Sequence, residues 1–355
     1  MIDSVSGWPA SVGEWLKKTD RQTILAVDSH TGGNPTRIVM SGIELPSGTR
    51  TVDTARAWLR DQADHWRRRL VHEPRGGGLT CAVLPIATKE DGCDIGAVIL
   101  EPGSYPPMCG HCMIGFACVI VELHLLPNLW TKNDREANFK IRTPAGPVGV
   151  TAHRENGHLT TITLTNVASY VVERGETTVA GKTIPVELLY GGDYYITVDA
   201  DAIDLSLDRD NATEIVHFAR QLRTAYTKDG VRDPITGGLL DVYQVMFFRR
   251  LSDQDGKRAK IVVVAPPGVI DRSPCGTGSS ALFSKFVTDG EIAADTILTT
   301  QSIIGSTFTV AAQDLSNHGG RRTVTPLLTG RAYINGFLTI AADSNDSLAD
   351  GFAPL

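Results

Sequence analysis

The chain has 355 residues, a formal net charge of −6 and 42% hydrophobic residues. This length suggests two domains with separate cores, and the acidic balance argues against a nucleic-acid partner or an anionic membrane surface. No apolar run reaches the roughly 18 to 20 residues that span a bilayer, residues 1–22 have no signal-peptide core, and six cysteines are too few for a disulfide framework. A cytoplasmic protein is therefore expected.

The first half of the chain is predicted to alternate short strands with two helices. Residues 1–23 form an N-terminal extension that includes a turn of helix. Apolar residues at helical spacing predict a helix over 54–70, and a nearly uniformly apolar segment predicts a buried helix over 112–126. β-Branched or alternating segments predict strands at 24–28, 38–40, 81–86, 95–100, 139–143, 148–152 and 160–164.

The second half repeats this plan. Helical spacing predicts helices over 212–226 and 279–289, and strands are predicted at 183–186, 194–198, 242–248 and 261–265. In both halves a helix is followed by strands, a Gly/Pro loop, a cysteine and a buried helix. The repeated order predicts a pseudo-symmetric pair of α+β domains.

Two cysteine motifs, Met108–Gly115 and Asp271–Ser280, carry the strongest chemical signal. In each, the cysteine is followed by glycine and by a segment that can open a helix. A thiol at a helix N-terminus meets unpaired backbone N–H groups and the positive end of the helix dipole, so we expect a lowered thiol pKa. The same N–H groups can hold a carboxylate. Two facing motifs would supply two thiols and one anion-binding site.

Two other interpretations of these cysteines are weaker. Cys109 and Cys112 form a C-x-x-C, which is typical of thiol–disulfide oxidoreductases, but this interpretation leaves Cys275 unexplained. A zinc site built from Cys109, His111 and Cys112 with Cys118 or His124 would crowd three ligands into four residues. No metal is therefore expected.

Acid–base catalysis by two cysteines explains both motifs. Inversion of an amino-acid α-carbon needs a base on one face and an acid on the other, and a thiolate and a thiol can exchange these roles. Helix N–H groups would stabilise the enediolate without a cofactor. The sequence has no phosphate-binding loop and no dinucleotide fingerprint.

At these residues the sequence resembles the proline racemase family. The resemblance rests on Met108–His111, Asp271–Gly278, Asp28–Gly33 and Glu73–Gly76, and it covers most of residues 24–353. It implies a diaminopimelate-epimerase-like fold of two α+β domains, each with a barrel-like sheet around a central helix. The implied domains are residues 24–157 with 333–355, and residues 158–332.

The resemblance also implies roles for individual residues. Cys109 and Cys275 would be the acid/base thiols, and Asp271 would accept a hydrogen bond from the substrate's ring nitrogen. Backbone N–H donors for the substrate carboxylate would come from Gly110, His111, Gly276 and Thr277. Pocket residues that could read a ring substituent are His30, Asp193 and Tyr243.

The implied activity is a cofactor-independent racemase or epimerase of proline or 4-hydroxyproline, with the 4-hydroxyproline 2-epimerase preferred. Relatives that dehydrate trans-3-hydroxy-L-proline typically carry threonine at the second thiol, so Cys275 favours inversion. Arg67–Leu70 resembles the dehydratase branch, and that alternative stays open. The expected partner is a small-molecule substrate; a homodimer also stays open.

Overall fold

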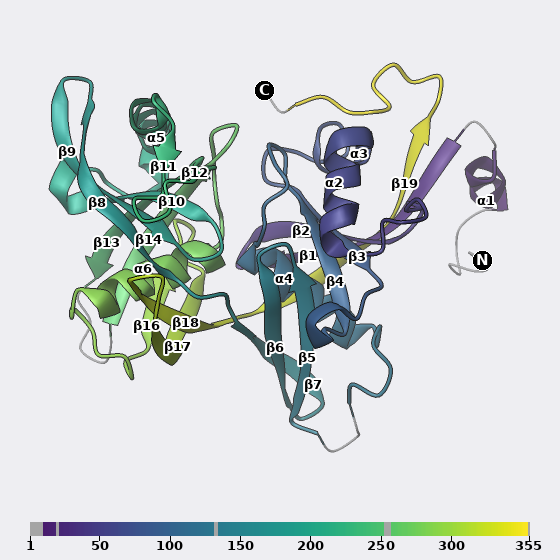
Figure 1. Ribbon diagram of the computed structural model, residues 1–355. Coiled ribbons are helices and arrows are strands. Elements are labelled where there is room, and N and C mark those ends of the chain that lie inside the picture. The colour runs from purple at the N-terminus through teal and green to yellow at the C-terminus, as the bar shows by residue number, and fades with distance from the viewer. Residues whose placement is uncertain (1–9, 19–20, 131–133, 252–256, 354–355) are drawn as a thin grey trace.

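The computed structural model describes residues 10–18, 21–130, 134–251 and 257–353 (Figure 1). Its elements form two halves, and the expected α+β class is confirmed. In the described residues, no helix combines the length and apolar character needed to cross a membrane. The helices are α1 (Ala10–Leu16), α2 (Val52–Gln62), α3 (His65–Val71), α4 (Gly110–Glu122), α5 (Ala212–Thr227) and α6 (Gly276–Thr288), with short 3-10 turns at Glu90–Gly92, Ala200–Ile203 and Arg209–Asn211.

The strands of the first half surround α4. β1 pairs antiparallel with β2 and β19, β2 runs parallel to β3, and β4 runs parallel to β5. Their bounds are β1 (Arg21–Thr31), β2 (Asn34–Ser41), β3 (Cys81–Ile86), β4 (Ile95–Leu100), β5 (Glu136–Thr143), β6 (Gly146–Glu155), β7 (His158–Thr165) and β19 (Ala332–Asp343).

The second half repeats this connectivity around α6. β10 runs parallel to β13 with α5 between them in sequence, and β14 runs parallel to β16 with α6 between them. The bounds are β8 (Tyr170–Val179), β9 (Lys182–Tyr190), β10 (Tyr194–Asp199), β11 (Val231–Arg232), β12 (Leu239–Leu240), β13 (Gln244–Leu251), β14 (Lys257–Ala265), β15 (Val269–Ile270), β16 (Leu298–Gln301), β17 (Thr307–His318) and β18 (Arg321–Gly330).

Each cysteine therefore precedes a helix that connects two parallel strands. Every residue of α4 from Gly110 to Val121 is buried, and so is every residue of α6 from Gly276 to Val287. A helix that is buried over this whole length loses contact with water only inside a shell of strands. This burial fixes each helix inside its own half, with a cysteine at each helix N-terminus.

Two predictions about the helices need correction. The segment predicted as one helix over 54–70 forms α2 and α3, because the chain leaves helical geometry at Ala63 (φ −137°). Asp64 then accepts hydrogen bonds from Tyr105 Oη (2.9 Å) and Arg67 Nε (2.7 Å), which hold this bend against the rest of the domain. The buried helix predicted over 112–126 begins at Gly110 and ends at Glu122.

The strand pairing also bears on the domain boundary. β7 pairs antiparallel with β6, from Gly149 opposite Thr165 to Glu155 opposite His158, and it lies beside β5 and β6 in Figure 1. The sequence predicted that the chain leaves the first domain near residue 157. β7 also pairs antiparallel with β18 of the second half, from Leu327 opposite Thr165 to Gly330 opposite Ile162, and so joins the two halves. We propose that the chain crosses at the end of β7, after Thr165, and that it returns with β19.

Candidate active site

The N-termini of α4 and α6 meet at two glycines. A Cβ atom on Gly110 would lie 2.7 Å from the Gly276 Cα, and one on Gly276 would lie 2.8 Å from the Gly110 Cα. Real Cβ atoms do not approach backbone this closely, so only glycine permits this contact. The contact brings the N-cap residues of the two helices, Cys109 and Cys275, to the walls of one cavity.

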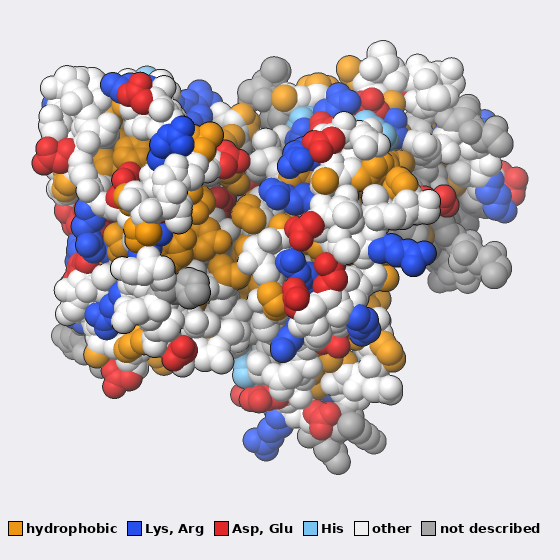
Figure 2. Space-filling model, viewed as in Figure 1, with side chains coloured by type: hydrophobic (Ala, Val, Ile, Leu, Met, Phe, Trp, Pro, Cys, Tyr) orange, Lys and Arg blue, Asp and Glu red, His pale blue; other side chains and the backbone are white. Residues whose placement is uncertain are grey.

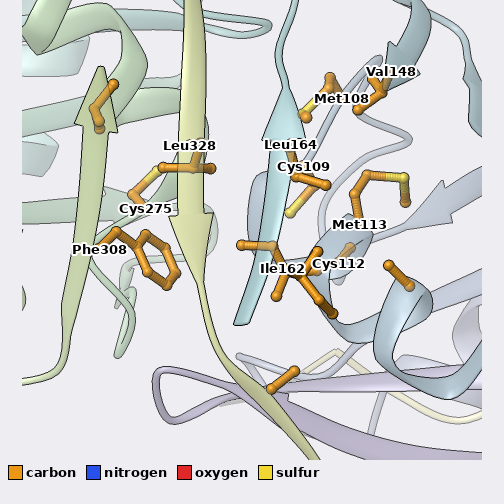
Figure 3. Close-up of a cluster of buried hydrophobic side chains, with 14 of the residues drawn as sticks. Met108, Cys109, Cys112, Met113, Val148, Ile162, Leu164, Cys275, Phe308 and Leu328 are labelled. Atoms are coloured by element: carbon orange, nitrogen blue, oxygen red, sulfur yellow. The ribbon is translucent and has the colours of Figure 1, made fainter. Parts of the chain in front are cut away.

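The cavity is small and lies between the two halves. The cavity has a volume of about 50 Å³. A water needs about 10 to 15 Å³, so the cavity holds a few waters and is on the scale of a small metabolite. In Figure 3, Cys275 lies with Phe308 and Leu328 on one side, and Cys109 lies with Cys112 and Ile162 on the other. Figure 2 shows hydrophobic side chains at the junction of the two halves and charges of both signs elsewhere on this face.

Most of the site residues predicted from the sequence line this cavity. The lining includes Cys109, Gly110, His111, Asp193, Asp271, Cys275, Gly276 and Thr277. Tyr243 lies behind it and donates a hydrogen bond from its hydroxyl to Asp193 Oδ2 (2.9 Å). His30 is not among the lining residues; its ring instead packs on Tyr333 at a centroid distance of 5.5 Å.

The Cys109 thiol is held by the first turn of α4. Its Sγ lies 3.2 Å from His111 Nδ1, and the carbonyl of His111 accepts a hydrogen bond from Thr31 Oγ1 (2.9 Å). A hydrogen bond with Cys112 lowers the pKa of Cys109, but desolvation and the charge of Glu101 outweigh it and raise the pKa to about 12. The lowered pKa expected from the helix N-terminus alone is therefore wrong for Cys109, because burial has the larger effect.

The Cys275 thiol has a different set of partners. Its Sγ lies 3.3 Å from the Tyr195 hydroxyl, which also lies 2.5 Å from Thr277 Oγ1. Cys275 has a backbone φ of +56°, a conformation that costs a non-glycine residue of order 1 kcal/mol or more and that concentrates at functional sites. Burial, followed by the charge of Asp271, raises the pKa of Cys275 well above its ordinary value.

Three carboxyl groups share the cavity with the thiols. Desolvation raises the pKa of Asp271 to about 6 although Ser273 donates two hydrogen bonds to it. Burial likewise raises the pKa of Asp193 to about 7. Desolvation and the charge of Asp193 raise the pKa of Glu101 to about 8. A cation in the cavity would favour the charged forms of these acids.

Sequence reasoning missed Glu101 and Tyr195. Glu101 directly follows the apolar strand β4 and precedes the loop to Cys109, so an acidic residue at the end of a buried strand was an available signal. Tyr195 shows no such signal, because it is one apolar residue of an apolar strand.

These positions can be compared with known proteins. The model of the family described as proline racemase matches residues 26–353. This chain belongs to the proline racemase family. A 4-hydroxyproline 2-epimerase of Streptosporangium roseum is 31% identical over 92% of this chain and 97% of its own length. A trans-3-hydroxy-L-proline dehydratase of Bacillus thuringiensis is 29% identical over 92% of this chain and 96% of its own length.

Solved structures agree with the family assignment. The crystal structure of a hydroxyproline epimerase from Agrobacterium vitis, with bound trans-4-hydroxy-L-proline, has a TM-score of 0.83 and 30% identity, and the match covers 93% of this chain and 95% of that one. The fold and the class of enzyme predicted from the sequence, a racemase or epimerase, are thereby confirmed.

The acidity of Asp271 predicts a pH limit for this family member. A carboxyl group is ionised above its pKa, so Asp271, the acceptor that the resemblance implies for the substrate amine, is charged above about pH 6 and loses its charge below it. We expect kcat/KM to fall as the pH drops through about 6, because this ratio reports the ionisation of the free enzyme. The pH profile of kcat/KM measures it. Asp271→Asn should have a lower kcat/KM and no limb at this pH; an unchanged limb in that variant would assign it to another group.

Proposed function

We propose that this protein inverts the α-carbon of 4-hydroxyproline or proline by passing a proton between Cys109 and Cys275, without a cofactor. The main support for this proposal is the position of the two thiols. Each lies at the N-cap of a buried helix, and the two line a single small cavity from opposite halves of the chain. An inverting enzyme needs proton-transfer groups on both faces of the reacting carbon.

In this proposal the thiolate of one cysteine removes the α-proton, and the thiol of the other protonates the opposite face. The negative charge that develops on the substrate carboxylate is met by the N–H groups of Gly110, His111, Gly276 and Thr277. The first N–H groups of a helix have no acceptor within the helix, and donors fixed in advance stabilise such charge without reorganisation. The reverse reaction uses the same groups with their roles exchanged.

The raised thiol pKa values fit a reaction that begins only when substrate is bound. A thiolate at either position is desolvated and faces the charge of Glu101 or Asp271. A bound substrate brings a cationic amine that neutralises the carboxylates, which removes this repulsion. Asp271 is the proposed acceptor for the amine, since it lies beside Cys275 at the cavity wall.

The preference for 4-hydroxyproline rests on Asp193. This buried carboxyl accepts hydrogen bonds from Tyr243 Oη (2.9 Å) and Gln244 Nε2 (3.4 Å), so it is fixed in position and can accept from a ring hydroxyl. The named epimerase relative and the epimerase with bound trans-4-hydroxy-L-proline support the same substrate.

Proton NMR in D₂O tests the proposal with trans-4-hydroxy-L-proline, L-proline and trans-3-hydroxy-L-proline, each supplied alone. Loss of the α-proton signal together with growth of the epimer would support inversion and name the substrate. Loss of the 3-hydroxyl group to give a pyrroline carboxylate would instead make the protein a dehydratase. No reaction with any of the three would contradict the proposed substrate class.

A further inference from the structure

A second chemical feature lies beside the Cys109 thiol. Cys81 from β3 and His111 and Cys112 from the first turn of α4 point potential metal-ligand atoms at one another, and these atoms all lie within 4.8 Å of each other. All three side chains are buried, with at most 4% of each residue exposed. The proposed proton transfer uses neither Cys81 nor Cys112, so their chemistry is unexplained.

The sulfur–nitrogen distances suit a tetrahedral ion, and Cys109 lies beside the group of three whose ligand atoms are all within 4.8 Å of one another. Zinc–sulfur and zinc–nitrogen bonds of about 2.3 and 2.0 Å put neighbouring S and N ligand atoms roughly 3.5 Å apart. Cys112 Sγ lies 3.4 Å from His111 Nε2, and Cys109 Sγ lies 3.9 Å from the same nitrogen. Three cysteines and one histidine are a common zinc-binding set. Sequence spacing gave no indication of Cys81, because β3 brings it beside the first turn of α4 only in the folded chain.

The surroundings supply two further requirements of a metal site. Thr36 Oγ1 lies 3.9 Å from Cys112 Sγ and can donate to it, and such outer hydrogen bonds orient ligands and support a thiolate. An ion also needs a path to the site. Cys81, Cys109 and His111 all line the substrate cavity, so an ion can enter where the substrate does.

We propose that Cys81, Cys109, His111 and Cys112 form a binding site for a thiophilic divalent cation of the zinc class, and that its occupation inhibits the enzyme. Each sulfur that enters the coordination sphere gives up its proton to the buffer, and His111 binds through a neutral ring nitrogen. Because Cys109 is both a ligand and a proposed acid/base, the bound ion and turnover exclude each other.

Cobalt(II) is the probe, since a Co²⁺ ion in a tetrahedral thiolate site absorbs strongly in the visible and near-ultraviolet. We expect the reduced, metal-free wild-type chain to bind one Co²⁺ with thiolate charge-transfer bands, and Zn²⁺ to displace it. Cys81→Ala and Cys112→Ala should each weaken binding at least about tenfold. This spectrum does not depend on any substrate, so the metal site can fail while the proposed function holds, and the reverse.

Cys118→Ala is the matched control, because Cys118 is buried and its thiol instead donates to Ala332 O (3.5 Å). Binding should survive both in this control and in Cys275→Ala. If Cys275→Ala abolishes binding while Cys81→Ala leaves it intact, the ion bridges the two catalytic thiols and the proposal is wrong. The proposal would also be wrong if the wild-type protein bound Co²⁺ without thiolate charge-transfer bands. This result needs no variant, so it holds even if a variant fails to fold.

Discussion

Cys109→Ala and Cys275→Ala should each abolish inversion of the α-carbon in both directions. Each variant lacks the proton-transfer group for one face. That group is the base in one direction and the acid in the other, so both directions are lost. A positioned acid or base contributes about 10²- to 10⁴-fold, and we expect a loss of at least about 10³-fold in kcat. Polarimetry started from each Cα epimer of the substrate measures this loss.

Cys118→Ala and Cys93→Ala control for the loss of a buried thiol as such. Both residues are buried free cysteines outside the cavity lining, and both variants should keep near-wild-type kcat. A protein that needs Cys109 and Cys112 for activity but tolerates Cys275→Ala would instead be a C-x-x-C oxidoreductase, and the two-thiol mechanism would be wrong.

Gly276→Ala should damage activity through the contact of the two helices. The added Cβ would lie 2.6 Å from Leu328 Cδ2 and 2.8 Å from the Gly110 Cα. The leucine can yield, but the backbone of α4 cannot move without displacing the N–H groups and thiol at its end. Misplacement of reacting groups by about 1 Å can cost 10²-fold, and overpacking typically costs about 1 to 3 kcal/mol of stability.

The measurements are kcat/KM and the midpoint of urea unfolding. Gly13→Ala is a suitable control: Gly13 lies within α1 and a Cβ there would meet nothing within 4 Å, so this change should leave activity unaltered. If Gly276→Ala retains full activity, the close approach of α4 and α6 does not define the site.

Short sequence patterns predicted the buried strands correctly. The strands at 81–86 and 95–100 coincide with β3 and β4, because continuous apolar runs flanked by polar or glycine-rich loops are typical of buried strands. β8 (Tyr170–Val179) was missed, since its central residues Glu173–Thr177 are polar and largely exposed. The break between α2 and α3 is held by one hydrogen bond from the distant Tyr105, which helical spacing does not encode.

In the candidate site, too, the sequence indicated some residues, while other features depend on the fold. Motif chemistry indicated Cys109 and Cys275, the family resemblance added Asp271, and all three line one cavity. The sign of the thiol pKa shifts could not be predicted, because it depends on how far folding removes water and brings Glu101 and Asp271 near the sulfurs. The proximity of Cys81 to Cys112 likewise arises only when β3 packs beside α4.

Deuterium exchange in the single-thiol variants tests the two-thiol account most directly. Each purified variant is incubated in D₂O with the two Cα epimers of the substrate separately, and the α-proton is followed by NMR. We predict that Cys109→Ala exchanges the α-proton of one epimer and Cys275→Ala that of the other, both with retained configuration. If both variants exchange the same epimer, or if either still inverts it, the two cysteines do not serve opposite faces.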